Sequence, residues 1–282
     1  MDPNRRSIRR ELEIEVATLP REILGELRGR LGQLAEGGEV DGQLVGIFIK
    51  AAVKGLIWYN TANYDGAVPG SFDDLNNMDA APAGALWCNA IESGAASGWP
   101  FTDWIEDIVI RQSGPDVYDS WVAGETAWTS PEITSAFELL GDVIGKSHGG
   151  GQYINATNFG DVGIEMFTEP PGCKFVHQAS FISDFFVNQA GATAEDFDFF
   201  VMPDINSAYQ GALTGGGDMF GMFNDTPQAR SLMEYLTTAE AQQIWASRGG
   251  FIAANTDVPA SAYTSASDRK AGEALAAASA FR

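Results

Sequence analysis

Basic residues are scarce in this 282-residue chain. Lys and Arg number 17 against 38 Asp and Glu, which gives a formal net charge of -21 at pH 7. A surface of this sign repels phosphate backbones and anionic lipid headgroups. The charge balance therefore predicts no nucleic-acid partner and no attachment to an acidic membrane surface, and it says nothing about the fold.

Long apolar runs are also absent from the sequence. No stretch approaches the roughly 20 apolar residues of a membrane-spanning helix, so we expect no direct membrane insertion. The N-terminal sequence MDPNRRSIRRELEIEV is basic and then amphipathic, without the apolar core of a secretory signal peptide. We therefore expect no export signal in the chain as given.

Residues that hold metals or carry nucleophilic catalysis are few. The two histidines, His148 and His177, are far apart in the sequence and form no recognisable zinc spacing with the two cysteines, so a structural role is the better interpretation of each. The GGGD segment lacks the Lys and Ser or Thr of a P-loop, and neither G-x-G-x-x-G nor G-x-S-x-G occurs. We expect no metal and no cofactor. Cys88 and Cys173 are either free buried thiols or one disulfide.

Helical and strand patterns alternate along most of the chain. Apolar residues recur every four positions over residues 7–36, which predicts helices, whereas residues 44–59 contain two β-branched and aromatic runs, LVGIFI and GLIWYN. Ser130-Pro131 and Thr226-Pro227 are start signals for later helices. Interleaved strands and helices are typical of an α/β fold.

The stretch Ile91 to Ile108, IESGAASGWPFTDWIEDI, differs from an ordinary core segment. Its first half is rich in glycine and small residues, which let backbone amides approach a ligand. The second half predicts a helix capped by Thr102 or Asp103, with Glu106 placed to close a capping box. The alternative is a well-capped helix behind a tight turn, without any ligand.

Aromatic, amide and carboxylate side chains recur in this stretch and in later ones. Aromatic faces stack on sugar rings, and carboxylates and amides bond to ring hydroxyls, so these residue types suit carbohydrate binding. The candidates are Glu92, Trp99, Asp103, Asn158, Phe159, Gln178, Phe181 and Asp218. Each aromatic residue taken singly is more often a core residue than a ligand contact.

A glycoside hydrolase is the alternative enzyme interpretation. It would use paired carboxylates among Glu92, Asp103, Glu106 and Asp107. Helical spacing argues against it, because the capping role explains Asp103 and Asp107 on one face and Glu106 falls beside solvent positions. Asp103 therefore stays as a helix cap that also touches the ligand, and Glu106 and Asp107 are left out of the predicted site.

Several separate motifs resemble one protein family. They are DGQLVGIFIKAAVKGLIWYN, ESGAASGWPFTDWIEDI, RQSGPDVYDSWV, GGGD and MEYLTTAEAQQIWASRGGFIAANTDV, which run in family order from about Val40 to Arg282. The chain resembles the extracellular solute-binding proteins of bacterial ABC transporters, in the carbohydrate group that serves α-glucosides and related oligosaccharides. The resemblance implies a two-lobe α/β fold of the Venus-flytrap type that closes over a sugar.

The resemblance also implies a domain arrangement. Residues 1–59 would be a remnant of the first lobe with the first hinge strands, residues 60–210 the second lobe, and residues 211–282 the hinge return and C-terminal helices. Hinges would lie at Leu44 to Tyr59 and at Ala212 to Phe220. Family members are usually longer at both ends, so we expect an incomplete first lobe in a fragment or reduced paralogue.

Site residues and partners follow from the same resemblance. The ligand-binding residues it implies are Lys50, Glu92, Ser93, Trp99, Asp103, Asn158, Phe159, Gln178, Phe181, Gly216, Gly217 and Asp218. The chain would be a non-catalytic, periplasmic or extracellular protein that delivers a carbohydrate to an ABC permease in the membrane. The other possibilities are the hydrolase above and a shortened paralogue that has lost sugar binding.

Overall fold

The computed structural model describes residues 38–40, 43–82 and 84–282. The helices predicted over residues 7–36 lie outside the described residues. The chain forms two compact units. The smaller unit holds the described residues up to Ala51, Gly217–Ser247 and Ala253–Ala262, and the larger unit holds Ala52–Gly216, Arg248–Ile252 and Tyr263–Arg282.

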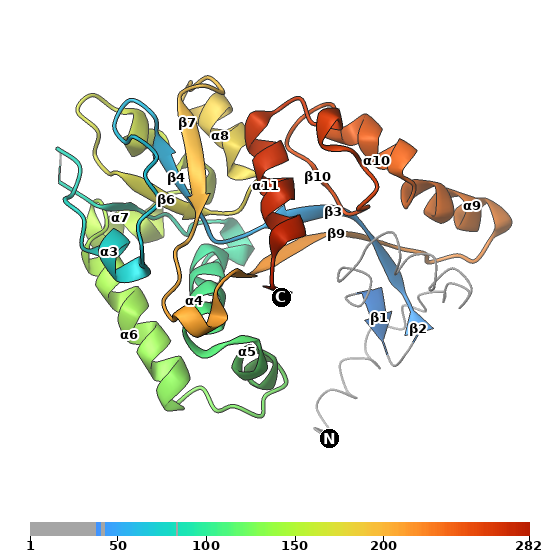
Figure 1. Ribbon diagram of the computed structural model, residues 1–282, viewed down its shortest axis with the longest axis horizontal. Coiled ribbons are helices and arrows are strands. Elements are labelled where there is room, and N and C mark those ends of the chain that lie inside the picture. Colours follow the sequence, from blue (N-terminus) through green and yellow to red (C-terminus); the bar gives the residue numbers. More distant parts are fainter. Residues whose placement is uncertain (1–37, 41–42, 83) are drawn as a thin grey trace. The chain divides into compact units, whose positions relative to one another are not determined.

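A four-stranded sheet lies at the centre of the larger unit (Figure 1). Its strand order is β5-β6-β4-β7, formed by β5 (Trp87–Cys88), β6 (Phe175–Gln178), β4 (Leu56–Asn60) and β7 (Phe197–Val201). Strand β4 runs antiparallel to both β6 and β7, whereas β5 is parallel to β6. A parallel neighbour requires a crossover connection, which the helices between β5 and β6 supply.

The larger unit also contains α-helices. They are α3 (Phe72–Asn76), α4 (Trp99–Ser113), α5 (Pro115–Val122), α6 (Pro131–Gly145), α7 (Gly150–Ala156), α8 (Ile182–Gln189) and α11 (Ala266–Ala277). Ser71 and Ser130 accept hydrogen bonds from main-chain amides as N-caps of α3 and α6, and the Ser130-Pro131 signal predicted the second of these starts. Short strands β8 (Ala212–Leu213) and β11 (Ala280–Phe281) pair in parallel.

The side chains of β4 alternate between two cores, as the period of a strand requires. Ile57 and Tyr59 are buried in a cluster that includes residues of α3, α4 and α6. Trp58 points to the opposite face, where its ring lies 5.6 Å from Phe186 of α8 and 4.8 Å from Phe199 of β7. The sheet is therefore covered on both faces, which explains why residues 56–59 of β4, LIWY, form an uninterrupted buried run.

The smaller unit contains a hairpin of β1 (Glu39–Val40) and β2 (Gln43–Leu44) and the helices α9 (Pro227–Leu236) and α10 (Ala239–Ala246). Thr226 and Thr238 cap these two helices through their hydroxyl groups. A three-stranded sheet has the order β10-β3-β9, with β3 (Gly46–Val53), β9 (Gly215–Gly221) and β10 (Ile252–Ala253). The chain passes from one unit to the other inside each of these three strands.

The fold class predicted from the sequence, α/β, is confirmed, but the start of α4 was predicted wrongly. The helix begins at Trp99 and not after Asp103, with Gly98 as its N-cap. Gly98 has a φ of 104°, a conformation that glycine adopts without strain, and Pro100 follows in the first turn. Asp103 therefore lies inside the helix, where it caps nothing.

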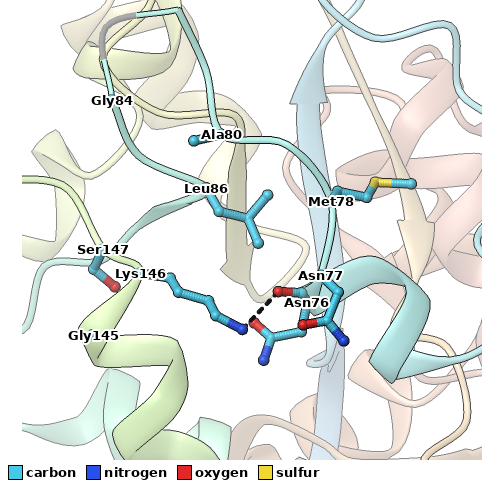
Figure 2. A pocket seen from close by; sticks show the side chains of 9 residues that line it. All are labelled: Asn76, Asn77, Met78, Ala80, Gly84, Leu86, Gly145, Lys146 and Ser147. Carbon is cyan, nitrogen blue, oxygen red and sulfur yellow. Dashed lines mark hydrogen bonds between the residues drawn. The ribbon is translucent and has the colours of Figure 1, made fainter.

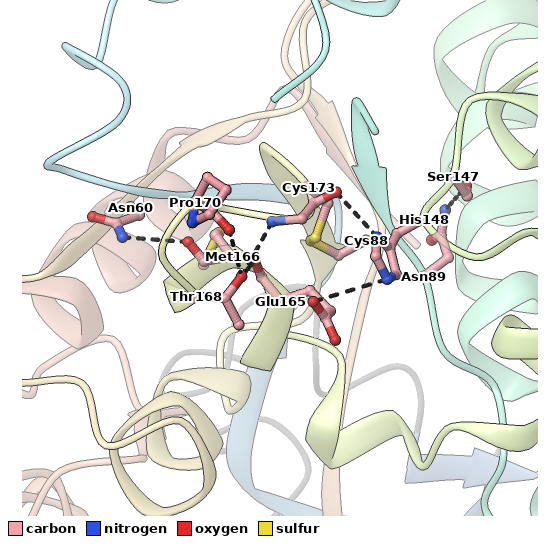
Figure 3. Close-up of a disulfide and its surroundings, with 11 residues drawn as sticks. Asn60, Cys88, Asn89, Ser147, His148, Glu165, Met166, Thr168, Pro170 and Cys173 are labelled. Carbon is pink, nitrogen blue, oxygen red and sulfur yellow. Dashed lines mark hydrogen bonds and ion pairs between the residues drawn. A yellow bond between two sulfur atoms is a disulfide. The ribbon is translucent and has the colours of Figure 1, made fainter. Parts of the chain in front are cut away.

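A disulfide joins Cys88 at the end of β5 to Cys173, which precedes β6 by two residues (Figure 3). His148 lies beside it, with Nδ1 3.1 Å from the carbonyl oxygen of Gly172 and Nε2 3.8 Å from Glu165. The bridge closes a sequence separation of 85 residues that contains α4 to α7.

Replacing both cysteines, Cys88→Ser with Cys173→Ser, should lower the free energy of unfolding by roughly 4 kcal/mol, because the unfolded chain regains the entropy of an 85-residue loop. Urea unfolding without reductant measures this loss. Dithiothreitol should destabilise the wild type and leave the double variant unchanged. Equal midpoints for the two oxidised proteins would contradict the prediction.

Candidate functional site

A carboxylate fixes the loop before α4. Glu92 accepts hydrogen bonds from the amide of Gly94 and from Nδ2 of Asn158, both at 2.7 Å. The main chain of Glu92 also pairs with the segment around Asn158. The Gly94 amide, followed by the Asn158 side chain, holds the pKa of Glu92 below its usual value, so this carboxylate is ionised at neutral pH.

Four aromatic side chains form a half-buried surface beside this carboxylate. We call Trp99, Phe159, Phe181 and Phe185 the aromatic platform. The Trp99 ring lies 5.1 Å from Phe159 and 5.9 Å from Phe181, and Phe185 lies 5.3 Å from Phe159. All four side chains are partly exposed. The platform thus joins the start of α4, the segment after Asn158 and the start of α8.

The platform and the Glu92–Asn158 pair offer two kinds of contact side by side. Phe159 follows Asn158 directly in the chain, and its amide donates to the carbonyl oxygen of Glu92 at 2.9 Å. Aromatic rings provide apolar stacking surface, and an ionised carboxylate with an amide provides hydrogen-bond acceptors and donors. This combination can bind and orient a ring that has an apolar face and polar edges.

The predicted residues Ser93 and Gln178 have local partners in the structure. The amide of Ser93 donates to the hydroxyl of Ser97 at 2.9 Å. Gln178 is 3% exposed, and its Oε1 accepts from the amide of Ala179 at 2.8 Å. Ser93 lies in the Glu92 loop, whereas the side chain of Gln178 is enclosed at the end of β6.

Four predicted residues, Lys50, Gly216, Gly217 and Asp218, lie on strands along which the chain passes from one unit to the other. In the smaller unit, Lys50 of β3 pairs with Asp218 of β9 at 3.5 Å. Gly217 packs against the main chain of Lys50 so closely that a Cβ atom would collide with it. Gly216 belongs to the larger unit and has open space where a side chain would be.

Asp103 lies inside α4 and not at the start of the helix, where the sequence predicted it. It is 4% exposed, and its Oδ1 pairs with Nζ of Lys54 at 2.6 Å. Burial raises the pKa of the Asp103 carboxyl against the opposing effect of Lys54. Burial alone would lower the pKa of Lys54, but Asp103 and Glu106 outweigh it and leave that pKa raised.

Asp107 is a fully buried carboxylate with partners on three elements. It accepts from Nε of Arg111 on α4 at 3.2 Å and from Oγ1 of Thr214, which follows β8, at 3.0 Å. It also lies 3.2 Å from Nε2 of His177 on β6, whose ring stacks on Trp104. Burial alone would raise the pKa of Asp107, but Arg111, His177 and Thr214 outweigh it and leave the pKa lowered.

Three residues of this region, Lys54, Asp107 and Phe185, are not among the predicted site residues. Phe185 lies four residues after Phe181, which is the spacing of one helix face, but no helix was predicted over these residues. For Lys54 the sequence gives no indication of a role in the site, apart from a charge within an apolar stretch. Asp107 was left out because a capping role explained the face that it shares with Asp103, and only the tertiary structure shows that this face of α4 is enclosed.

A separate polar cavity of about 330 Å³ lies between the loop after α3 and the end of α6 (Figure 2). Lys146 donates to the carbonyl oxygen of Asn76 and to Asp142, so its charge is already matched. No residue predicted to bind a ligand lines this cavity. We do not include it in the candidate site.

Comparison with known proteins places the chain in a family. Residues 26–271 match the family of bacterial extracellular solute-binding proteins, and the chain belongs to it. The osmoprotective compounds-binding protein GgtB of Synechocystis sp. is 33% identical over 245 residues, which is 84% of this chain and 58% of that protein. The alpha-glucosides-binding periplasmic protein AglE of Rhizobium meliloti is 34% identical over 244 residues, which is 83% of this chain and 53% of that protein.

Solved structures support the same fold. A chitin oligosaccharide binding protein superimposes with a TM-score of 0.73 at 20% sequence identity, over 94% of this chain and 68% of that chain. At this identity the likeness shows the fold alone. The chain spans little more than half of the length of the two relatives named above. In the part of the chain that the structure describes, no helix is both long and apolar enough to cross a bilayer.

Replacing Asp107 by Asn should lower the free energy of unfolding by about 3 to 5 kcal/mol near neutral pH, because Arg111 and His177 lose a buried anion. The pKa of Asp107 is lower in the folded protein than in the unfolded chain, where it is about 3.9. The stabilisation by the Asp107 anion is therefore complete above that unfolded pKa, and it is lost as the pH falls through the folded pKa. Urea unfolding of both proteins at decreasing pH should therefore show a shrinking difference.

The matched control is Asp142→Asn, which breaks the exposed pair of Asp142 with Lys146. This variant should cost no more than about 1 kcal/mol at neutral pH. Equal losses for the two variants, or a difference for Asp107→Asn that stays constant down to about pH 3, would contradict the assignment of Asp107 as a buried anion.

Proposed function

We propose that the chain is the sugar-binding component of an ABC importer and binds an α-glucoside or a related oligosaccharide without chemical conversion. The observation that carries the proposal is the aromatic platform beside the ionised Glu92 and Asn158. A sugar ring would stack on the partly exposed aromatic faces, and Glu92 would accept hydrogen bonds from its hydroxyl groups.

The family and the relatives support this proposal. One similar protein is described as an alpha-glucosides-binding periplasmic protein and another as an osmoprotective compounds-binding protein. Both descriptions fit a small polar ligand. We infer that the partner of this chain is a membrane permease and that the protein acts in the periplasm or at the cell surface.

The carboxylates of the site fit a binding role better than hydrolysis. Glu92 is held in its ionised form by its hydrogen bonds, and Asp103 pairs with Lys54. A glycosidase needs one carboxylic acid that protonates the leaving oxygen and a second carboxylate across the scissile bond. Glu92 pairs with an amide, and Asp103 and Glu106 both pair with the Lys54 ammonium, so these carboxylates are already engaged with protein partners.

Trp99→Ala and Phe181→Ala should each weaken sugar binding by about tenfold or more, because they remove a stacking face from the centre of the site. Calorimetric titration with maltose and trehalose measures the loss. Trp128→Ala is the matched control, because Trp128 is an exposed aromatic residue in the same unit, 64% accessible, and does not belong to the platform. It should bind sugar like the wild type.

Two results would count against the proposed function. If the folded wild type gave neither a heat of binding nor a shift of its melting temperature with any of a panel of glucosides, this result would contradict sugar binding. It would support a paralogue that has lost this activity. Release of reducing sugar during incubation, stopped by Glu92→Gln, would support the hydrolase instead.

A further inference from the structure

A polar stripe continues the aromatic platform along α4. Trp99, Asp103 and Glu106 follow one another at helical spacings of four and three residues, so they share one face of the helix. Trp99 belongs to the platform, and Asp103 lies one turn further, about 6 Å along the helix axis. The stripe therefore extends from the stacking surface toward the Lys54 ammonium.

The main chain fixes Lys54 next to the platform from the other side. Val53 accepts from the amide of Ser180 at 2.9 Å and donates to the Ser180 hydroxyl at 3.3 Å. Ser180 directly precedes Phe181 of the platform, and Val53 directly precedes Lys54. Two separate elements thus bring the Lys54–Asp103 pair and the aromatic rings into one region of the larger unit.

Asp103 has an unused hydrogen-bond acceptor. Its Oδ1 pairs with Lys54 at 2.6 Å, whereas its Oδ2 is buried and has no hydrogen-bond partner among the described residues. A buried carboxylate oxygen without a donor is costly, and a ligand hydroxyl that donated to it would remove that cost. Lys54 is 24% exposed at its side chain and retains one of its three N–H donors beyond the two ion pairs with Asp103 and Glu106.

We propose that Lys54 and Asp103 form a second subsite, which binds the hydroxyl groups of a ligand beyond the ring that stacks on the platform. Asp103 Oδ2 accepts from one hydroxyl, and Lys54 donates to a neighbouring oxygen. The ligand class is therefore a glucoside whose second residue carries hydroxyl groups, and not a free monosaccharide or a glycoside with an apolar substituent. This inference rests on the proposed function and names its ligand more closely.

The test compares two ligands that differ beyond the first ring. Methyl α-glucoside has an apolar methyl substituent, whereas maltose and trehalose carry a second hydroxylated ring. Asp103→Asn and Lys54→Met should each weaken disaccharide binding about tenfold or more and leave methyl α-glucoside within about twofold of the wild type. Calorimetric titration provides the dissociation constants, and circular dichroism confirms the fold of each variant.

Asp142→Asn is the matched control, because Asp142 pairs with Lys146 at 2.7 Å in the same unit and lies outside the platform. It should change neither ligand's affinity. Equal weakening of both ligands by Asp103→Asn would assign the pair a structural role and overturn the subsite, and so would unchanged disaccharide binding. Failure of the wild type to bind any of these sugars would instead overturn the proposed function, and the subsite with it.

Discussion

A buried carboxylate, Asp107, holds together the elements that carry the candidate site. It joins α4 to β6 through His177 and to the segment after β8 through Thr214. Trp99 stands at the start of α4, and Phe181 follows β6, so both depend on this junction for their positions. Gly55 is required beside it, because it has a φ of 68° and a Cβ atom there would collide with Asp107. A fully buried ion is costly unless several partners compensate it, and Asp107 has them.

Asp103 and Asp107 show how partners decide the state of a buried acid. The two carboxylates are one helical turn apart on α4, and both are almost completely enclosed. The pKa of Asp107 is lowered because Arg111, His177 and Thr214 stabilise the anion, whereas the pKa of Asp103 is raised because burial outweighs Lys54. Asp107 is saturated with protein partners, whereas one oxygen of Asp103 has no hydrogen-bond partner among the described residues. Asp107 serves the fold, and the Asp103 oxygen is the acceptor that we propose for a ligand.

The sequence predicted much of the local structure. The helix starts at Ser130 and Thr226 were predictable because a hydroxyl that caps a helix acts within three residues. The start of α4 was not predictable, because its N-cap is Gly98, which has a positive φ and no side chain that could mark the cap in the sequence. The residue types of the platform were also readable, apart from Phe185. Their assignment to ligand binding stays a prediction, because the type of a residue shows which contacts it can make and not whether a ligand binds there.

By itself the sequence determined the α/β class, the acidic surface and the residue types suited to a sugar, because these depend on composition and short-range periodicity. Only the tertiary structure decided which of those residues meet. Trp99, Phe159 and Phe181 lie on three segments far apart in the chain, and Glu92 reaches Asn158 across 66 positions. Only the fold could reveal Lys54 beside Asp103, because the pairing of charges across a core depends on how strands and helices pack, which no local pattern encodes.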